Sequence, residues 1–449
     1  MPGAIIGIVV DGKLAYVKPY GVRDVGTNAP VAEDTRFRIA SMTKGFTAIS
    51  ILKLRDGGKL QLDDPVAKYI PELADLKYPT KDSPVITIRL LLSHSEGFPE
   101  DNPWGDRQLA RTNETLSAWM RAGIPFSTAP GTSYEYSNYG FAILGQVIER
   151  VSGMPYKTYV TDNVLKPLGM TSSTFDVDSV PKDKIAYGYR WEEEQWKAEP
   201  LLPHGAFGSM GGLWTTAGDL SKYVAFLSAA FPPRDDPETG PIRRASAREM
   251  QQEWRVGSAS YVAGKLNVVS YGYGVRIATD CRFNYIVGHG GGLPGYGSYE
   301  TWLPDYGVGI ITFTNLTYTS LRSLHDDIYE AMQPVKRAVQ PSQALLDAKR
   351  DVSSLIAHWD PQLADRVLAD NVLLDQSAER RQKAYAAYAS CKADAGIDAE
   401  NPLRGAWRMT CDNGRAIWVR TTLAPTMPPR VQSVDVRTDP PPPQQNCRP

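Results

Sequence analysis

This sequence of 449 residues has few cysteines, almost no net charge and no long apolar run. Lys and Arg number 49 and Asp and Glu number 50, a formal net charge of −1, and no basic stripe or helix stands out. That balance argues against nucleic acid and anionic membranes as partners. No segment approaches the roughly 18 uninterrupted apolar residues of a membrane span. A hydrophobic content of 42% and a charged content of 22% are typical of a globular protein.

The four cysteines are Cys281, Cys391, Cys411 and Cys447. They form no C-x-x-C pair and no H-E-x-x-H motif accompanies them, which argues against a zinc site, and we predict no metal or other cofactor. An even count permits two disulfides in three connectivities, of which Cys391 with Cys411 is the most plausible pair. Four unpaired thiols remain the alternative, because nothing else in the sequence fixes the compartment.

Ser41-Met42-Thr43-Lys44 is the most informative stretch that is present. Serine and lysine three positions apart on a helix share one face, so the amine can reach the hydroxyl and act as its base. Such a match arises by chance about once or twice in a chain of this length. Two further matches, Ser50 with Lys53 and Ser179 with Lys182, lie in mid-helix and beside a proline. Only Ser41 is predicted at a helix N-terminus, where free N–H groups favour negative charge.

Two further elements follow in order. Tyr136-Ser137-Asn138 comes after a Pro-Gly turn and opens an apolar helix, and His289-Gly290-Gly291-Gly292 lies between two strand-like runs. In this order and spacing the three elements resemble the penicillin-recognising serine hydrolases. The resemblance is greatest to the branch of class C β-lactamases, D-alanyl-D-alanine carboxypeptidases and β-lactamase-like esterases. Leu91 to Gly97 and Gly211 to Thr216 agree with it, and it covers roughly residues 3 to 335.

The resemblance implies a role for each motif residue. Ser41 would attack a carbonyl to form an acyl-enzyme, Lys44 would be its base, and Tyr136 would transfer protons. The N–H groups of Ser41 and Gly292 would form the oxyanion hole. The predicted substrate-binding residues are Asn138, His289, Gly290 and Gly291.

Each of these residues also has a structural interpretation. Ser41 and Asn138 could cap helices, Lys44 could be a solvated helix lysine, and Tyr136 could be one of many buried tyrosines. Gly292 could be a turn glycine. The other four histidines have no recognisable partner and are interpreted as structural.

His289 is where the sequence departs from the β-lactamases, which have lysine there. We expect histidine at this place to bind the substrate carboxylate or the tyrosine. The departure favours a hydrolase of amide or peptide bonds in small substrates, similar to a D-aminopeptidase, amidase or carboxypeptidase. Alternatives are a carboxylesterase with weak or no β-lactamase activity and a non-catalytic ligand-binding homologue. The expected partner is a small molecule or short peptide, and the oligomeric state is unknown.

The pattern of apolar residues predicts an α+β fold. Residues 4–10 and 14–17 read as a hairpin around Asp11-Gly12, and strands are expected again at 271–277, 284–287, 298–303 and 308–313, before a helix near 321–332. Strands from both ends can share one antiparallel sheet, with the mainly helical residues 41–265 as an insertion. The site is expected in the cleft between sheet and helices. The hydrolase domain is therefore placed at residues 1–337.

Residues 338–449 are predicted to form a small α+β domain with a Pro-rich tail that is extended or disordered. Helices are expected at 344–359 and 380–393, and strands at 405–410, 416–422 and 430–436. No chemical motif occurs there, so a structural or substrate-gating role is expected. Met1 leads directly into the first strand with no signal peptide, which leaves the location unknown. Removal of a leader from a longer form would favour a periplasmic or secreted location.

Overall fold

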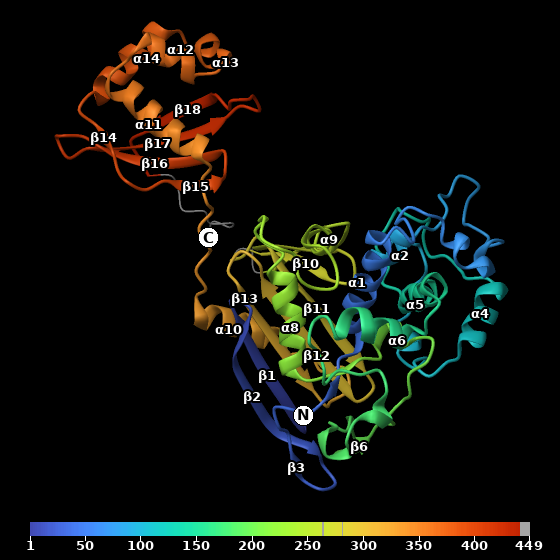
Figure 1. Ribbon diagram of the computed structural model, residues 1–449. Helices are drawn as coiled ribbons and strands as arrows, with labels where there is room; N and C mark the ends of the chain where they lie inside the picture. The colour runs from blue at the N-terminus through green and yellow to red at the C-terminus, as the bar shows by residue number, and fades with distance from the viewer. Residues whose placement is uncertain (263–264, 281, 441–449) are drawn as a thin grey trace. The chain divides into compact units, whose positions relative to one another are not determined.

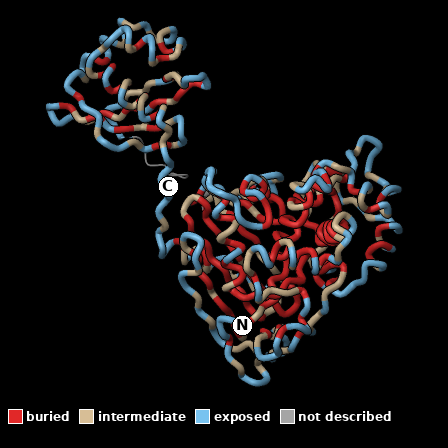
Figure 2. Tube along the Cα trace, in the orientation of Figure 1, coloured by how far each residue is buried: buried red, intermediate tan, exposed pale blue. Residues whose placement is uncertain are grey.

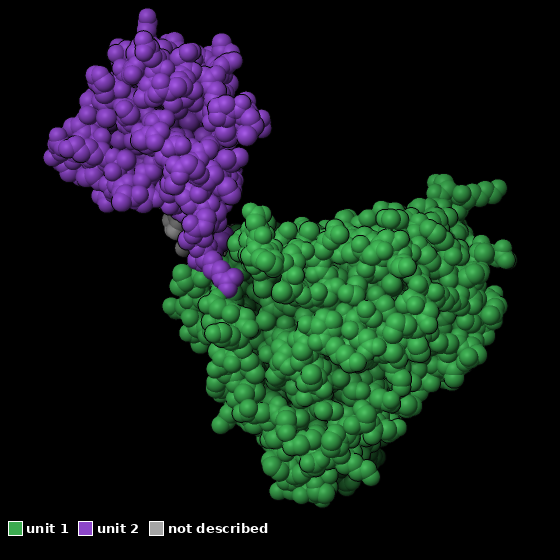
Figure 3. Space-filling view, viewed as in Figure 1, with its two compact units in different colours: residues 1–335, 446–449 green, residues 336–445 purple. Residues whose placement is uncertain are grey.

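The computed structural model describes residues 1–262, 265–280 and 282–440. The chain divides after Val335 into two compact units, which Figure 3 shows in different colours. The sequence placed the boundary two residues later, after 337. Among the described helices, none combines the length and the apolar character that crossing a membrane requires.

The first unit is built on a nine-stranded sheet in the order β3-β2-β1-β13-β12-β11-β10-β9-β8, with antiparallel pairing throughout (Figure 1). β1 pairs with β13, which confirms that strands from the two ends of this region share one sheet. The strands are β1 Gly3–Val10, β2 Lys13–Asp24, β3 Ala29–Pro30, β8 Arg255–Val262, β9 Lys265–Tyr271, β10 Arg276–Thr279, β11 Ile286–Leu293, β12 Tyr296–Leu303 and β13 Val308–Thr314.

The predicted N-terminal hairpin is confirmed. Asp11 and Gly12 join β1 to β2 with φ angles of 48° and 77°, the left-handed pair that a two-residue hairpin turn requires. Aspartate tolerates this region and glycine adopts it without steric cost, so the sequence fixes the turn.

Helices cover both faces of the sheet. Every residue of β13 is buried, and alternate side chains point to opposite faces. Ile311 joins the main core with Val224 of α8 (Ala217–Ser228), whereas Ile310 packs in a separate cluster with Tyr329 of α10 (Arg322–Met332). Figure 2 shows the burial concentrated in the interior of this unit.

The predicted helical insertion lies between β4 (Phe37–Arg38) and β8. β4 pairs with β7 (Trp214–Thr215), and β5 (Tyr189–Glu192) pairs with β6 (Gln195–Ala198). The remaining helices of the insertion are α1 Thr43–Asp56, α2 Ile88–Leu92, α3 Asn102–Gly105, α4 Asn113–Ala122, α5 Asn138–Ser152, α6 Tyr156–Val160, α7 Gly208–Gly211 and α9 Arg244–Met250.

Two expectations about the later strands were wrong. The strand expected at 271–277 is the end of β9, a turn, and the start of β10, with Gly274 at φ 70°. A Cβ on Gly274 would lie 2.5 Å from the backbone oxygen of Lys44, so this glycine lets the turn pack against α1. β8 begins at Arg255, inside the region expected to be helical, because an edge strand with many small and polar residues has weak apolar periodicity.

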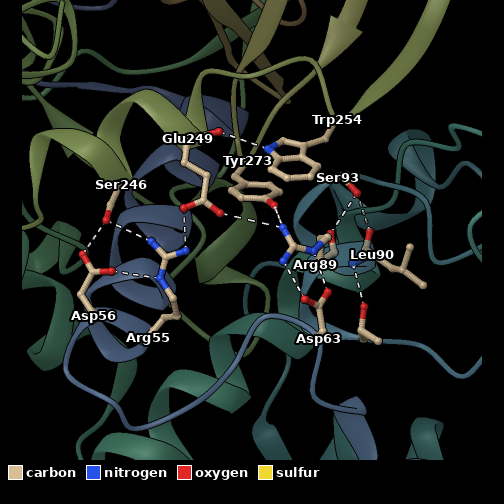
Figure 4. Close-up of polar contacts among 11 residues, drawn as sticks. Arg55, Asp56, Asp63, Arg89, Leu90, Ser93, Ser246, Glu249, Trp254 and Tyr273 are labelled. Atoms are coloured by element: carbon tan, nitrogen blue, oxygen red, sulfur yellow. Dashed lines mark hydrogen bonds and ion pairs between the residues drawn. The ribbon is translucent and has the colours of Figure 1, made fainter. Parts of the chain in front are cut away.

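A network of ion pairs and aromatic contacts fastens the C-terminal end of α1 to its neighbours (Figure 4). Arg55 pairs with Glu249 of α9 at 2.6 Å, and Arg89 of α2 pairs with Asp63 at 2.7 Å. The Arg89 guanidinium also lies over the Trp254 ring, 4.7 Å from its centroid. Each partly exposed pair contributes about 1 kcal/mol or less, so the network orients helices more than it stabilises them.

The second unit packs its helices on a small sheet around Trp407, Met409 and Ile417. Its elements are α11 Gln343–Ala357, α12 Pro361–Val367, α13 Asp370–Asp375, α14 Ala378–Tyr385, β14 Lys392–Ala393, β15 Asp398–Asn401, β16 Arg404–Thr410, β17 Ala416–Leu423 and β18 Val431–Arg437. The predicted small α+β fold with three main strands is confirmed. The sequence missed α12, α13, β14 and β15.

A disulfide joins Cys391 to Cys411, as predicted. The helix expected at 380–393 ends at Tyr385. Cys391 forms its disulfide with Cys411, which directly follows β16, and the two residues after Cys391 pair with β16 as strand β14. Cys281, Cys447 and nearly all of the Pro-rich tail lie outside the described residues. The structural or gating role of this unit stays a prediction.

Candidate active site

Ser41 lies in a tight turn between β4 and α1. The turn, Ala40–Met42, is a short 3-10 helix, and Ala40 before the serine has a left-handed φ of 49°. A non-glycine residue in that region stores strain, which is common beside reactive groups. Ser298 of β12 donates a hydrogen bond to the backbone oxygen of Ile39 at 2.8 Å and holds the turn against the sheet.

Lys44 is completely buried one helical turn after Ser41. Its Nζ lies 3.0 Å from Ser41 Oγ, 2.7 Å from Asn138 Oδ1 and 3.0 Å from the backbone oxygen of Met210. Among the described residues no carboxylate forms an ion pair with it. Burial therefore lowers the pKa of Lys44 to about 7, although the charges of Asp106 and Asp101 partly oppose the shift.

These three contacts orient the lysine when it is neutral. A neutral amine has two N–H donors and one lone pair. The carbonyl oxygens of Asn138 and Met210 can only accept, so they take both donors. The lone pair is then directed at the third neighbour, the Ser41 hydroxyl, which can donate its proton. The contacts therefore give Ser41 a base in the orientation that nucleophilic catalysis requires.

Tyr136 borders the same cavity as Ser41, and Lys44 Nζ lies 4.8 Å from the centre of its ring. Burial raises the pKa of Tyr136 well above its ordinary value, so the phenol keeps its proton and can serve as a donor. The ring of His94 lies 4.2 Å away, centroid to centroid. The structure thus brings Ser41, Lys44 and Tyr136 together as the sequence predicted.

The first N–H groups of α5 hold Tyr136 and Asn138 in place. His94 Nδ1 accepts from Ser137 N at 3.1 Å, and the two carboxylate oxygens of Asp101 accept from Asn138 N and Tyr139 N at 2.7 and 2.8 Å. Ser137 Oγ accepts from the next N–H, that of Gly140. Every N–H group that an α-helix leaves free at its start has a partner here, with a negative charge at the positive end of the helix dipole.

Asn138 and His289 differ from the expected substrate ligands. Asn138 is fully buried, binds Lys44, and donates to Asn102 Oδ1 at 3.1 Å. His289 Nε2 lies 2.9 Å from the Tyr271 hydroxyl and Nδ1 lies 2.5 Å from Gly290 O. Burial holds the pKa of His289 well below its usual range, so the neutral ring donates to Gly290 and accepts from Tyr271. In this tautomer both ring nitrogens are engaged, so binding a substrate carboxylate would require the ring to give up one of these contacts, and that expectation stays a prediction.

A cavity of about 470 Å³ opens above the serine. Beyond Gly288, β11 has no pairing to β10, so its glycine edge is open towards this cavity. Gly291 permits a close approach to the serine turn, because a Cβ there would lie 2.3 Å from Ile39 O. Side chains and backbone around the cavity include Ser41, Asn102, Asp106, Tyr136, Arg276, His289, Gly290, Gly291, Gly292, Tyr318 and Arg322.

Sequence reasoning missed four charged or polar residues of the site: His94, Asp101, Asp106 and Arg276. His94 lies in the Leu91 to Gly97 segment that was noted, and its buried partner is a backbone N–H that no sequence pattern reveals. Arg276 is in the region interpreted as one continuous strand. Asp101 and Asp106 flank α3, a four-residue helix with no periodic signal.

The other Ser-x-x-Lys pairs are structural. Ser50 Oγ donates to Phe46 O inside α1, and Lys53 binds Pro241 O. Ser179 Oγ donates to Asp176 O at the surface. In the described part of the chain, no three His, Cys, Asp or Glu side chains gather closely enough to bind a metal ion.

Comparison with known proteins places this geometry in a family. The model of the Beta-lactamase family matches residues 1–332, which contain the sheet, the insertion and the cavity. The chain belongs to the beta-lactamase family. Members are serine hydrolases, in agreement with the Ser41 and Lys44 geometry. Protein flp of Staphylococcus aureus strain COL is 30% identical over 326 residues, 70% of this chain and 60% of that protein, so this chain spans about three fifths of that relative.

Solved structures show the same fold. The octameric penicillin-binding protein homologue of Pyrococcus abyssi has a TM-score of 0.64 at 22% identity and matches 98% of this chain and 95% of its own. D-alanine carboxypeptidase AmpC of Burkholderia cenocepacia has a TM-score of 0.59 at 22% identity, over 74% of this chain and 93% of its own. The first match covers nearly the whole chain, whereas the other covers about three quarters of it.

Removal of the Asp101 carboxylate tests the capping arrangement. Asp101→Ala leaves the N–H groups of Asn138 and Tyr139 without acceptors, so we expect the free energy of unfolding to fall by about 1–3 kcal/mol. Urea unfolding followed by circular dichroism measures it. Asp82→Ala, in an exposed loop, is the matched control and should change stability by less than about 0.5 kcal/mol. Equal stability of the two variants would contradict the capping role.

Proposed function

We propose that this member of the beta-lactamase family hydrolyses amide or peptide bonds of small substrates through an acyl-enzyme on Ser41. The single observation that carries the proposal is the buried Lys44 amine, 3.0 Å from Ser41 Oγ and bonded to two carbonyl oxygens that can take both of its N–H donors. The activity would be similar to that of a D-aminopeptidase, an amidase or a carboxypeptidase.

The steps follow from the positions of the groups. Ser41 Oγ attacks the carbonyl carbon while its proton moves to Lys44 Nζ. The carbonyl oxygen becomes negative and accepts from the N–H groups of Ser41 and Gly292, which both border the cavity. The bond to the leaving nitrogen then breaks, and that nitrogen takes a proton from the Tyr136 hydroxyl, which protonated Lys44 replenishes. Water attacks the acyl-enzyme by the same route in reverse.

Arg276 supports a substrate with a carboxylate. Its guanidinium lies on the cavity wall, 5.6 Å from the centre of the Tyr136 ring, and among the described residues no carboxylate forms an ion pair with it. A partly buried arginine without an ion pair is favoured by a ligand that neutralises its charge. Because Tyr136 serves the leaving group, Arg276 would bind a carboxylate at that end of the substrate. The sequence predicted such a role for His289.

Two other functions fit the same scaffold. A carboxylesterase would use the same nucleophile and base, because these residues determine the reaction type more than the leaving group. A non-catalytic homologue would keep the fold without acylation. Each predicts a different result in the two experiments below.

The first experiment tests the nucleophile. Ser41→Ala should abolish covalent labelling by a fluorophosphonate probe, because it removes the only serine whose hydroxyl faces a buried amine among the described residues. Ser50→Ala, the matched control from the same helix, should label at the wild-type rate. Labelling that persists in Ser41→Ala, or a wild-type protein that does not label, would contradict the acyl-enzyme.

The second experiment tests the carboxylate. Arg276→Ala should lower kcat/KM for a D-alanyl dipeptide with a free C-terminus by roughly 10- to 100-fold more than for the same dipeptide amidated there, since a hydrogen bond to a charged group contributes about 1.5–3 kcal/mol. Arg121→Ala, an exposed arginine on α4, is the control.

Steady-state assays of both peptides decide the outcome, with circular dichroism to check folding. An equal loss of kcat/KM on the two peptides would contradict the proposed binding of a carboxylate by Arg276. Turnover of small esters without turnover of either peptide would favour the esterase.

A further inference from the structure

Asp106 faces the same cavity as Arg276 and is the most unusual acidic group there. It follows α3, is 3% exposed, and borders the cavity together with Ser41. Its Oδ1 is buried and has no hydrogen-bond partner among the described residues. Buried polar atoms nearly always have partners, so an unpaired carboxylate oxygen at a cavity indicates a ligand.

The surroundings of Asp106 place it away from the leaving-group end. Gly105 before it lies against Asn138, where a Cβ would be 2.8 Å from the Asn138 side chain. Tyr318 borders the cavity with Asp106 and influences its charge, and the Tyr318 ring lies directly against Gly292. These neighbours place Asp106 on the Asn138 and Gly292 side of the cavity, where we expect the acyl part of a substrate to extend.

Asp106 and Arg276 carry opposite charges at the cavity but are not in contact with each other. Among the described residues neither Asp106 nor Arg276 forms an ion pair, although both border the cavity and both act on the charge of Lys44. Had they been adjacent, they would have neutralised each other. Space between unpaired opposite charges suits a ligand that carries one charge at each end.

We propose that Asp106 binds a positively charged amino group on the acyl part of the substrate, so that the enzyme prefers amides whose acyl residue has a free α-amine. This inference rests on the proposed function and names its substrate class more closely, as an aminopeptidase-like or dipeptidase-like substrate. Burial raises the pKa of Asp106 to about 7, and an adjacent ammonium group would favour its ionised form.

A pair of nearly isosteric substrates isolates the amine. D-alanyl-p-nitroanilide carries an ammonium group where D-lactoyl-p-nitroanilide carries a hydroxyl. The wild-type protein should have a higher kcat/KM for the alanyl compound, and Asp106→Asn should lower the ratio of the two constants by roughly 10- to 100-fold, the change expected for one charge-assisted hydrogen bond. Asp106→Glu should restore part of the ratio.

Glu100→Gln is the control, because it removes a nearby exposed carboxylate that does not border the cavity. It should keep the wild-type ratio. A wild-type ratio near one, or a ratio in Asp106→Asn within about threefold of the wild-type ratio, would overturn the proposal. The wild-type result stands even where a variant does not fold.

Esters separate this inference from the proposed function. Turnover of methyl D-alaninate and methyl D-lactate without turnover of either anilide would reject the amide hydrolase, while the ratio of the esters would still measure the preference for an amine. Protection of Ser41 from fluorophosphonate labelling by D-alaninamide, compared with D-lactamide, measures the same preference without turnover. Equal protection by the two amides would overturn the role of Asp106.

Discussion

One buried amine is the constraint on which the site depends. Lys44 is enclosed by Ser41, Asn138 and the backbone of Met210, with no carboxylate in contact among the described residues. A charged ammonium group there would lack a counter-ion, so burial favours the neutral amine, and the two carbonyl oxygens direct its lone pair at the serine. The 3-10 turn that holds Ser41, the start of α5 and helix α7 each supply one wall of this enclosure. Their packing matters for catalysis because it excludes water from Lys44 Nζ.

The charges around the cavity tune that amine and define the ligand. Burial lowers the pKa of Lys44, the charges of Asp106 and Asp101 partly oppose that shift, and Arg276 adds to it. Asp101 is engaged by the N-terminus of α5. Asp106 and Arg276 form no ion pair among the described residues, so we propose that their charges serve a substrate. The same charged groups would therefore set the reactivity of Ser41 and determine which substrates bind in the cavity beside it.

Much of this arrangement could be predicted from the sequence. Asp11-Gly12 fixed the first hairpin, the apolar runs fixed most strands of the sheet, and the motifs located Ser41, Lys44 and Tyr136, because each depends on local spacing. The turn at Gly274 and the strand boundary beside it could not be predicted, since they are determined by packing against the backbone of α1. The roles of His94, Asp106 and Arg276 depend on contacts between distant segments. His289 was located correctly, yet its ring is engaged by Tyr271, which lies 18 positions earlier, and no local pattern reports that contact.

The most direct test of the account is the protonation of Lys44 itself. In protein labelled with ¹³C at the lysine Cε, the Lys44 signal can be assigned by its loss in Lys44→Arg and followed by NMR as the pH is raised. The account predicts a midpoint near pH 7, where burial places the pKa of Lys44. Solvated lysines titrate near pH 10.4, about three units above the midpoint expected for Lys44. A Lys44 signal that titrates with those lysines would show that the amine stays charged at neutral pH, and would contradict its role as the base.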